Sequence, residues 1–213
     1  MKICCISDLH GNLNFNVPEC DVLVIAGDIC PTANHSINFQ KSWLETNFNI
    51  WLSDQSAKHI IGIAGNHDFI FEHEIPKINW NYLFESSLII DGIKFAGHPW
   101  TPEFYDWAFN VRRGDLYMKH EKIDNDTNVL ITHGPPRGIL DKVYSFIGTV
   151  VKDNLGDNEL STKIQNIPNL KLHAFGHLHS SHGLLEQNGI TYINASLLNE
   201  EYKMVYEPII IDL

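Results

Sequence analysis

Long apolar runs are absent from this sequence of 213 residues. No stretch approaches the roughly 20 consecutive apolar residues that a helix needs to cross a bilayer, so we expect no membrane association. The segment MKICCISDLHGN contains a short apolar run that ends in polar residues, and it lacks a small-residue cleavage site. We interpret this segment as a buried strand rather than a signal peptide.

Cysteine is also scarce, with only Cys4, Cys5, Cys20 and Cys30, and no Cys-x-x-Cys pair occurs. Cys4 and Cys5 are neighbours in an expected strand, so their side chains point to opposite faces and cannot easily pair with each other. Reduced thiols are the simplest interpretation, and we therefore expect a cytoplasmic protein.

Basic residues are in the minority, because 15 Lys and Arg face 26 Asp and Glu and give a formal net charge of −11. Long nucleic acids are bound by clustered Lys and Arg, so we expect no long nucleic acid as a partner. The 12 histidines and any bound cations would reduce the negative charge, so the charge favours a small substrate only weakly.

Short apolar segments recur along the chain and are typical of buried strands. The first six are Ile3–Ile6, Val22–Ala26, Ile60–Ala64, Leu88–Ile90 continuing to Phe95, Val129–Thr132 and Leu172–Phe175. The next two, Gly183–Glu186 and Ile190–Asn194, flank Asn188-Gly189, which predicts a two-residue hairpin. Val205–Ile211 is a further strand, and Pro208 within it indicates a sheet edge.

Two segments have the spacing or charge pattern of helices. Apolar residues recur at near-helical spacing within Asn34–Ala57, and Asp157–Asn166 has acidic residues early and Lys163 late. Alternation of strand and helix in the N-terminal half predicts parallel pairing, whereas the C-terminal hairpin makes the sheets mixed. We expect an α/β fold in a single domain over residues 1–213.

Polar side chains follow five of these strands at their carboxyl ends. In open α/β sheets this edge is where ligands bind, and residues two apart in an extended segment point the same way. The glycines at positions 27, 65 and 176 would permit the sharp turns that aim these side chains. The residues are Asp8 and His10, then Asp28, then Asn66, His67 and Asp68, then His133, and finally His177 and His179.

The motifs DLH, GD, GNHD, THG and GHLH, taken in this order, resemble those of the calcineurin-like metallophosphoesterase superfamily. The resemblance runs from residue 8 to residue 179, and the order of five motifs on strand ends is far more specific than any single one. It implies a four-layer α/β/β/α sandwich, in which two mixed sheets are flanked by helices.

The resemblance also implies two divalent metal ions. One would be held by Asp8, His10, Asp28 and His179, and the other by Asp28, Asn66, His133 and His177, with Asp28 bridging the two. The oxygen and nitrogen ligands suit Mn²⁺, our first choice, or Fe, Zn²⁺, Ni²⁺ or Mg²⁺. A hydroxide between the ions would attack phosphorus, His67 would donate a proton to the leaving group, and Asp68 would orient the His67 ring.

The branch of the family is indicated by further segments. The Gly-Asp motif continues as Ile-Cys-Pro-Thr without arginine, unlike the protein Ser/Thr phosphatases. GHPWTP with WAFN, and HGPPRGILD, resemble the brain-type metallophosphoesterase-domain group, which acts on phosphodiesters including cyclic nucleotides. We therefore expect a small phosphodiester as substrate and choose Trp100, His98 and Arg137 as substrate contacts.

Several alternatives stay open. The aromatic residues Trp100, Tyr105, Trp107 and Phe109 fit a packed surface loop better than a platform for a nucleobase, and Arg112, Arg113 and Arg137 fit solvated ion pairs as well as phosphate contacts. The main alternative function is a phosphomonoesterase acting on small metabolites or nucleotides. A metal-binding scaffold without activity, and a nuclease, are less favoured. The oligomeric state is left undetermined.

Overall fold

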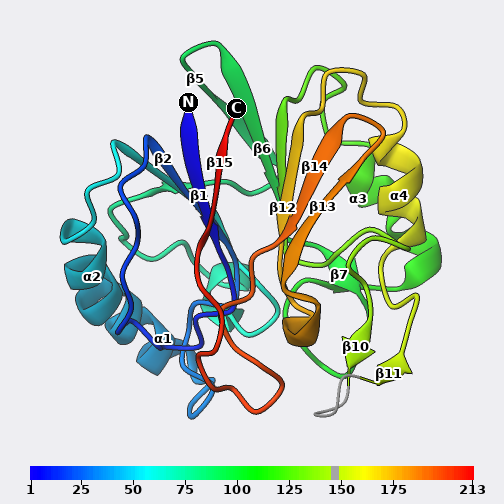
Figure 1. Ribbon diagram of the computed structural model, residues 1–213. Helices are drawn as coiled ribbons and strands as arrows, with labels where there is room; N and C mark the ends of the chain where they lie inside the picture. Colours follow the sequence, from blue (N-terminus) through cyan, green and yellow to red (C-terminus); the bar gives the residue numbers. More distant parts are fainter. Residues whose placement is uncertain (145–148) are drawn as a thin grey trace.

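The computed structural model describes residues 1–144 and 149–213 (Figure 1). Its centre consists of two mixed sheets. The first sheet has the strand order β15-β1-β2-β3-β4, and the second has the order β13-β14-β12-β9-β6-β5. The first contains β1 (Lys2–Ile6), β2 (Val22–Ala26), β3 (His59–Ile63), β4 (Asn81–Tyr82) and β15 (Ile209–Asp212); the second contains β5 (Ser86–Ile90), β6 (Ile93–His98), β9 (Val129–Thr132), β12 (Leu172–Phe175), β13 (Gly183–Gln187) and β14 (Ile190–Asn194).

The helices lie on the outer faces of both sheets. On one side, α1 (Ile37–Trp43), a π-helical turn η1 (Leu44–Phe48) and α2 (Asn49–Ser53) form one continuous helical stretch. On the other side lie α3 (Tyr117–His120) and α4 (Asn158–Ile164) (Figure 1). Short 3₁₀ turns are η2 (Phe69–Glu72), η3 (Arg113–Asp115) and η4 (His179–Ser181), and two ribbons pair β7 (Thr101–Pro102) with β8 (Asn110–Val111) and β10 (Val143–Tyr144) with β11 (Val150–Lys152).

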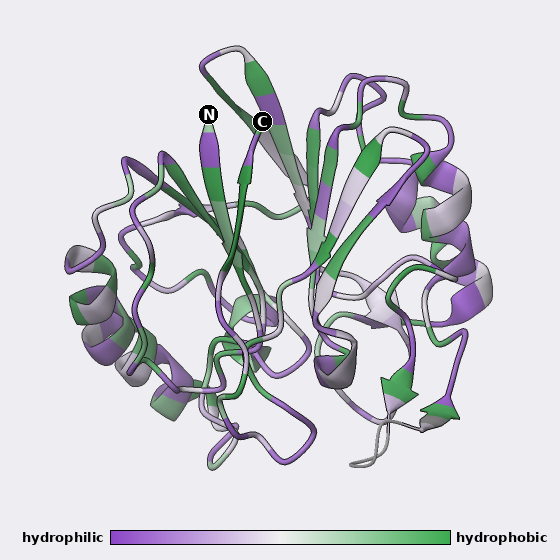
Figure 2. Cartoon of the chain, in the orientation of Figure 1, coloured by the Kyte–Doolittle hydropathy of each residue, from purple (hydrophilic) through white to green (hydrophobic). Residues whose placement is uncertain are grey.

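Three apolar clusters hold these four layers together. The middle cluster lies between the two sheets, where side chains such as Val24 and Ile63 meet Val129 and Ile193. The outer clusters place α1, η1 and α2 against the first sheet and α4 against the second. Figure 2 shows hydrophobic colouring along the strands and hydrophilic colouring on much of the outer helices and loops. The predicted α/β/β/α sandwich of two mixed sheets is therefore confirmed.

Parallel pairing governs the centre of each sheet. β1 pairs with β2 and β2 with β3 in parallel, and β12 pairs in parallel with β9 and β14. The carboxyl ends of these strands therefore reach the same edge of the molecule, as the sequence predicts. Asn188 and Gly189 both have positive φ in the β13–β14 turn, so the predicted hairpin is confirmed. β15 lies at a sheet edge as predicted, but it covers Ile209–Asp212, so Val205–Pro208 of the expected strand lie outside it.

Two further expected elements differ from the observed ones. The segment predicted as one strand from Leu88 to Phe95 is a hairpin of β5 and β6, because Asp91 and Gly92 adopt positive φ of 49° and 81° and turn the chain back. The helix expected over Asn34–Ala57 covers Ile37–Ser53 and contains the π-helical turn. Among the described residues, none of the helices has both the length and the hydrophobicity required to traverse a lipid bilayer.

Candidate metal centre

The loops that follow β1, β2, β3, β9 and β12 meet at one end of the two sheets. Asp8 follows β1, Asp28 follows β2, Asn66 follows β3, His133 follows β9, and His177 and His179 follow β12. Asp8, His10, Asp28 and His177 all have positive φ, between 43° and 69°. Such conformations are uncommon outside glycine, and they cluster at functional sites because the surrounding structure must enforce them.

Glycines allow these loops to approach each other closely. A Cβ atom on Gly65 would lie 2.3 Å from Oδ1 of Asp28, and one on Gly176 would lie 2.1 Å from Oδ2 of Asp8. Of the three glycines expected to supply sharp turns, only Gly27 has a positive φ, at 96°. Gly65 and Gly176 must be glycine for a different reason, because no side chain fits between their backbones and the carboxylates.

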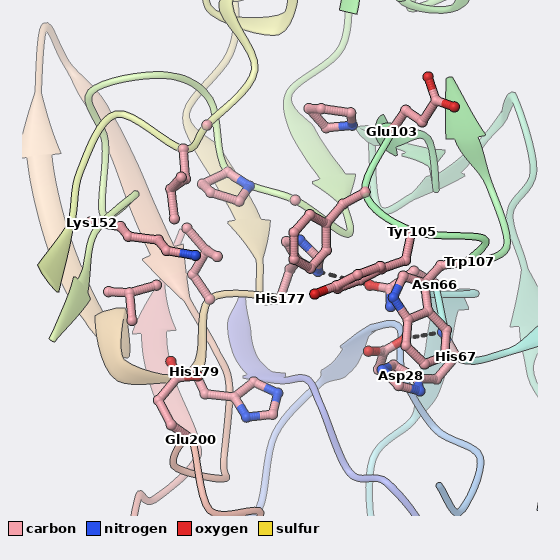
Figure 3. A pocket seen from close by; sticks show the side chains of 18 of the residues that line it. Asp28, Asn66, His67, Glu103, Tyr105, Trp107, Lys152, His177, His179 and Glu200 are labelled. Carbon is pink, nitrogen blue, oxygen red and sulfur yellow. Dashed lines mark hydrogen bonds between the residues drawn. The ribbon is translucent and has the colours of Figure 1, made fainter. Parts of the chain in front are cut away.

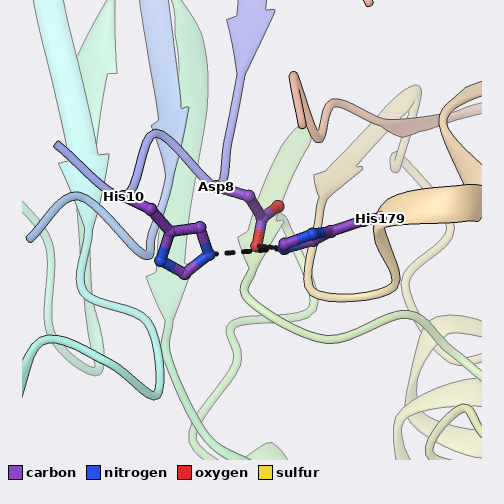
Figure 4. A group of neighbouring side chains, drawn as sticks. All are labelled: Asp8, His10 and His179. Atoms are coloured by element: carbon purple, nitrogen blue, oxygen red, sulfur yellow. Dashed lines mark hydrogen bonds and ion pairs between the residues drawn. The ribbon is translucent and has the colours of Figure 1, made fainter. Parts of the chain in front are cut away.

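One group of ligand atoms is formed by Asp8, His10, Asp28 and His179. The Nε2 atoms of His10 and His179 are 3.3 Å apart, and Nε2 of His179 is 3.4 Å from Oδ1 of Asp8 (Figure 4). Nε2 of His10 lies 3.6 Å from Oδ2 of Asp28. All four side chains are buried. Ligand atoms of Asp8, His10 and His179 lie within 4.8 Å of one another, and Asp28 joins them through its contact with His10. Such a combination of nitrogen and oxygen ligands suits a divalent cation.

A second group is formed by Asp28, Asn66, His133 and His177. Oδ1 of Asn66 lies 2.9 Å from Nε2 of His133 and 2.7 Å from Nδ1 of His177. Nε2 of His133 is 3.4 Å from Oδ2 of Asp28. The structure thus brings together all seven side chains that the sequence selects as metal ligands.

Asp28 belongs to both groups through a single oxygen. Its Oδ2 faces His10 on one side and His133 on the other, whereas its Oδ1 accepts the backbone N–H of His67 at 2.7 Å. Asp28 is therefore the residue that would help to hold an ion in either group, while its Oδ1 fixes the carboxylate and the loop that carries Asn66 and His67.

Backbone carbonyls orient two of the ligand rings. Nδ1 of His133 is 2.9 Å from the carbonyl oxygen of Ala26, and Nδ1 of His179 is 3.0 Å from that of Asn199. A carbonyl can only accept, so each Nδ1 carries a proton, and each ring presents Nε2 to the centre, as a lone pair once the ring is neutral. This is the usual arrangement for a histidine that binds a metal ion, and it shows that the residues fit such an ion.

Charge in the centre is balanced within these groups. Burial opposes ionisation, but His179 and His133 hold the pKa of Asp8 and of Asp28, respectively, below the ordinary range of a carboxyl group. Burial likewise opposes a charged imidazole, yet Asp28 raises the pKa of His133, and Asp8 that of His179, to about 9. Metal ligands must be deprotonated, so an ion that binds here replaces the protons on these rings.

For the other two histidine ligands, burial has the largest effect on the pKa of the ring. It lowers the pKa of His10 and of His177 to about 4. Both rings are therefore neutral near pH 7 and offer lone pairs without first losing a proton.

His67 and Asp68 lie beside this centre, but their relation differs from the expected one. The carboxylate of Asp68 accepts backbone N–H groups of Ile29, Cys30 and Gly65 at 2.8–3.2 Å. The expectation that Asp68 orients the His67 ring is therefore wrong: its oxygens tie together the loops after β2 and β3. The ring of His67 contacts His35 instead, with Nδ1 and Nε2 3.3 Å apart.

A cavity of about 510 Å³ opens next to the centre (Figure 3). Asp28, Asn66, His67, His177 and His179 line its floor. Its walls carry the aromatic residues Phe104, Tyr105, Trp107 and Tyr202, and the charged residues Glu103, Arg113, Lys152 and Glu200. The cavity therefore joins the metal ligands to surfaces suited to a flat ring and to charged groups.

The three residues chosen as substrate contacts do not line this cavity. Trp100 donates its indole N–H to Glu85, and the ammonium of Lys119 lies 3.6 Å from its ring centre. His98 is buried within β6, and Arg137 donates to the carbonyl of Asn154. These choices are wrong because a position near a motif in sequence does not fix the direction of the side chain.

The aromatic residues between positions 100 and 109 serve two different roles, packing of a surface loop and lining of the cavity. Trp100 and Phe109 pack against each other with ring centres 5.7 Å apart, as a packed loop predicts. Tyr105 and Trp107 line the cavity, as a stacking platform predicts. Tyr202 and Lys152 also line it, and no motif in the sequence distinguishes them. The positive φ of Tyr202, visible only in the fold, turns its ring toward His10 and His179.

Comparison with known proteins agrees with this geometry. The family model for calcineurin-like phosphoesterases matches residues 1–181. The human and mouse proteins named metallophosphoesterase domain-containing protein 1 are each 33% identical over the whole chain, which covers 71% of their length. The crystal structure of phosphopantetheinyl hydrolase from Mycobacterium tuberculosis superposes with a TM-score of 0.55 over 94% of this chain and 90% of that one, at 14% identity, and shares the fold.

Proposed function

Because the chain belongs to the calcineurin-like phosphoesterase family, we propose that it is a phosphodiesterase that hydrolyses cyclic nucleotides or related small phosphodiesters. The observation that carries the proposal is the pair of overlapping ligand groups that share Oδ2 of Asp28 on the floor of an open cavity. Two divalent ions held there would clamp a phosphoryl group and activate a water molecule, with Mn²⁺ as our first choice.

The chain's own residues supply the remaining parts of the reaction. His67 lines the cavity together with Asp28 and Asn66, so its ring would lie beside a phosphate held by the ligand groups. We assign His67 as the proton donor to the leaving oxygen, a contribution that is typically about 10²–10⁴-fold in rate. Asp68 holds the backbone loops on which Asp28 and His67 stand.

The cavity walls support a substrate with a flat ring and a compact phosphoester. Tyr105, 77% exposed, and Trp107 stand on one wall and offer faces on which a base could stack. Lys152 on the opposite wall has no ion-pair partner among the described residues, so its ammonium group is available to an anionic substrate (Figure 3). The complete set of ligands and a proton donor favours an enzyme over a scaffold, and the net charge of −11 disfavours a nuclease.

The substrate class is tested by comparing a diester with a monoester. The purified protein is loaded with Mn²⁺ and assayed on bis-p-nitrophenyl phosphate and p-nitrophenyl phosphate, and then on 2′,3′- and 3′,5′-cyclic nucleotides. We expect a higher kcat/KM on the diester and hydrolysis of at least one cyclic nucleotide. Preference for the monoester would replace our proposal by the alternative, a phosphomonoesterase of small metabolites or nucleotides. No hydrolysis of any ester by metal-loaded protein would overturn both.

A further inference from the structure

The ring of His67 is held by a residue from a distant part of the chain. Nδ1 of His67 lies 3.3 Å from Nε2 of His35, which belongs to the loop before α1. Both sequence neighbours of His67 have acceptor oxygens, but those of Asp68 accept backbone N–H groups and that of Asn66 faces His133 and His177. His35 is therefore the side chain that contacts Nδ1 of His67.

Aromatic packing restricts both imidazole rings. The ring centre of Trp107 lies 4.2 Å from that of His67, and Trp107 meets His35 edge to face with centres 5.5 Å apart. Phe69 covers His35 at 5.3 Å, and His10 meets His67 edge to face at 4.9 Å. His67 is thus confined between a cavity wall and a metal ligand, and His35 fixes its remaining freedom, which is rotation of the ring.

The backbone of His67 is fixed independently of its ring. Its N–H donates to Oδ1 of Asp28 at 2.7 Å, and its carbonyl accepts from the side chain of Gln40 at 2.7 Å. Loss of the His35 contact would therefore change the orientation of the ring and leave the loop in place.

We propose that His35 is a positioning residue for His67: it accepts a hydrogen bond from Nδ1–H and so keeps Nε2 directed at the leaving oxygen of the substrate. The inference rests on the proposed function, because it gives His35 a role in proton donation. An imidazole suits this position because a carboxylate would add negative charge beside Asp28 and Asp68, which are both buried.

The atoms and electrons of the proposed step balance while the hydrogen bond between His67 and His35 stays in place. The bond between phosphorus and the leaving oxygen breaks, its electron pair stays on that oxygen, and the Nε2 proton of His67 joins it. Water provides the new oxygen on phosphorus and releases one proton, and His67 regains a proton from solvent. Nδ1 keeps its proton throughout, so the hydrogen bond to His35 exists before and after the step.

The first test compares leaving groups. A nitrophenolate departs with little help from an acid, whereas an alkoxide needs its proton, so loss of the donor is selective for alkyl esters. For His35→Ala we expect kcat on a cyclic nucleotide to fall by about ten- to a hundredfold, with KM changed by less than about twofold. On bis-p-nitrophenyl phosphate we expect a change of less than about threefold.

Matched variants separate positioning from damage to the fold. His67→Ala measures how far kcat falls when the proton donor is removed completely. His35→Gln, whose amide oxygen reaches the position of Nε2 and can accept from Nδ1–H, should restore most of the activity. His59→Ala replaces an exposed histidine as the control. Bound metal, measured by elemental analysis, should equal that of the unchanged protein in all four variants. Equal losses on both substrates, or no loss in His35→Ala, would overturn the proposal.

The second test does not depend on activity. ¹⁵N-edited NMR of the histidine rings in the metal-free protein reports which nitrogen of His67 carries the proton. We expect a protected Nδ1–H signal that disappears in His35→Ala and returns in His35→Gln. An unchanged signal in His35→Ala would contradict the contact. If the unchanged protein hydrolyses no ester while this signal behaves as expected, the proposed function fails and the positioning of the ring stands.

Discussion

At the scale of single residues, Asp28 has the most demanding position in the centre. Its Oδ2 faces a histidine of each ligand group, and its Oδ1 secures the loop of His67 through a backbone hydrogen bond. Its φ of 54° is unfavourable for a residue with a side chain. A Cβ atom on Gly65 would lie 2.3 Å from Oδ1 of Asp28, so only glycine at position 65 leaves room for the carboxylate. No other residue near the centre combines these constraints.

Replacement of this residue should therefore remove metal. We expect Asp28→Ala to retain at most one of two ions, because the second ligand group loses its one carboxylate and the first loses one of two. Elemental analysis after loading and dialysis measures the ratio of metal to protein, with the exposed Asp54→Ala as the matched control. Full occupancy of both sites in Asp28→Ala would refute the shared role of this residue.

Single residues also show how far the sequence could predict the site. The seven metal ligands follow strands directly, so the end of each strand fixes where they lie. Trp100 and His98 stand equally close to a motif, but one turns to Glu85 and the other is buried in β6. The side-chain directions that decide substrate contacts depend on packing between segments far apart in sequence, as Lys152 and Tyr202 illustrate.

At the scale of elements, the start of α4 illustrates how a helix supports the centre from a distance. Asp157 is its N-cap and accepts the backbone N–H groups of Glu159 and Leu160. Its other oxygen contacts Nε2 of His120, at the end of α3, at 2.5 Å. The backbone N–H of Asp157 donates to the carbonyl of Pro135, two residues after His133. The cap therefore links α3, α4 and the loop of a metal ligand.

This link predicts the effect of two substitutions on stability. Asp157→Ala should lower the free energy of unfolding by about 3–5 kcal/mol, because it breaks a buried pair and removes a cap. Asp157→Asn should lower the free energy of unfolding by about 1 kcal/mol less than Asp157→Ala does, since asparagine is also a good N-cap. Urea unfolding measures both, with the exposed Asp153→Ala as control. Equal stability of Asp157→Ala and the control would contradict the assignment.

Helices and turns were predictable from the sequence where the residues that specify them lie within the segment itself. The α4 segment carries its cap and its charges within itself, and the Asn188-Gly189 turn fixes the β13–β14 hairpin. The Asp91-Gly92 turn is as clear a signal, but the apolar residues on both sides hide it within one apparent strand. The short helix α3 has no local signal, because its position depends on the contact between His120 and Asp157.

At the scale of the whole molecule, the second sheet buries histidines that take no part in the centre. His173 on β12 is buried and its Nε2 lies 2.8 Å from the hydroxyl of Thr132, while His98 lies within β6. Burial lowers the pKa of His173 to about 3 and that of His98 to about 4, from an ordinary value of 6.5. Both rings are therefore neutral in the folded protein over the whole neutral and mildly acidic range.

These rings predict a loss of stability in acid. The unfolded chain takes up their protons below pH 6.5, but the folded protein does so only near pH 4 and 3, so stability is complete above pH 6.5 and falls below it. Each ring contributes at most about 1.4 kcal/mol per pH unit in this window. Urea unfolding at pH 7.5, 6 and 5 should give a shallower loss for His173→Gln than for the unchanged protein. Identical slopes would contradict a neutral buried His173.

The four layers matter to the centre because neither sheet contains it alone. The first sheet contributes Asp8, Asp28 and Asn66, and the second contributes His133, His177 and His179. The apolar cluster between the sheets sets their separation, and with it the distance between the two halves of the ligand set. The metal centre is thus a property of the way the two sheets pack.

The most direct measurement is the anomalous diffraction of a crystal of this protein soaked in Mn²⁺. We predict two peaks about 3.5–4 Å apart, one on each side of Oδ2 of Asp28. The first should be bound by Asp8, His10 and His179, and the second by Asn66, His133 and His177. No peak within this set of side chains, or peaks only elsewhere on the molecule, would contradict the account.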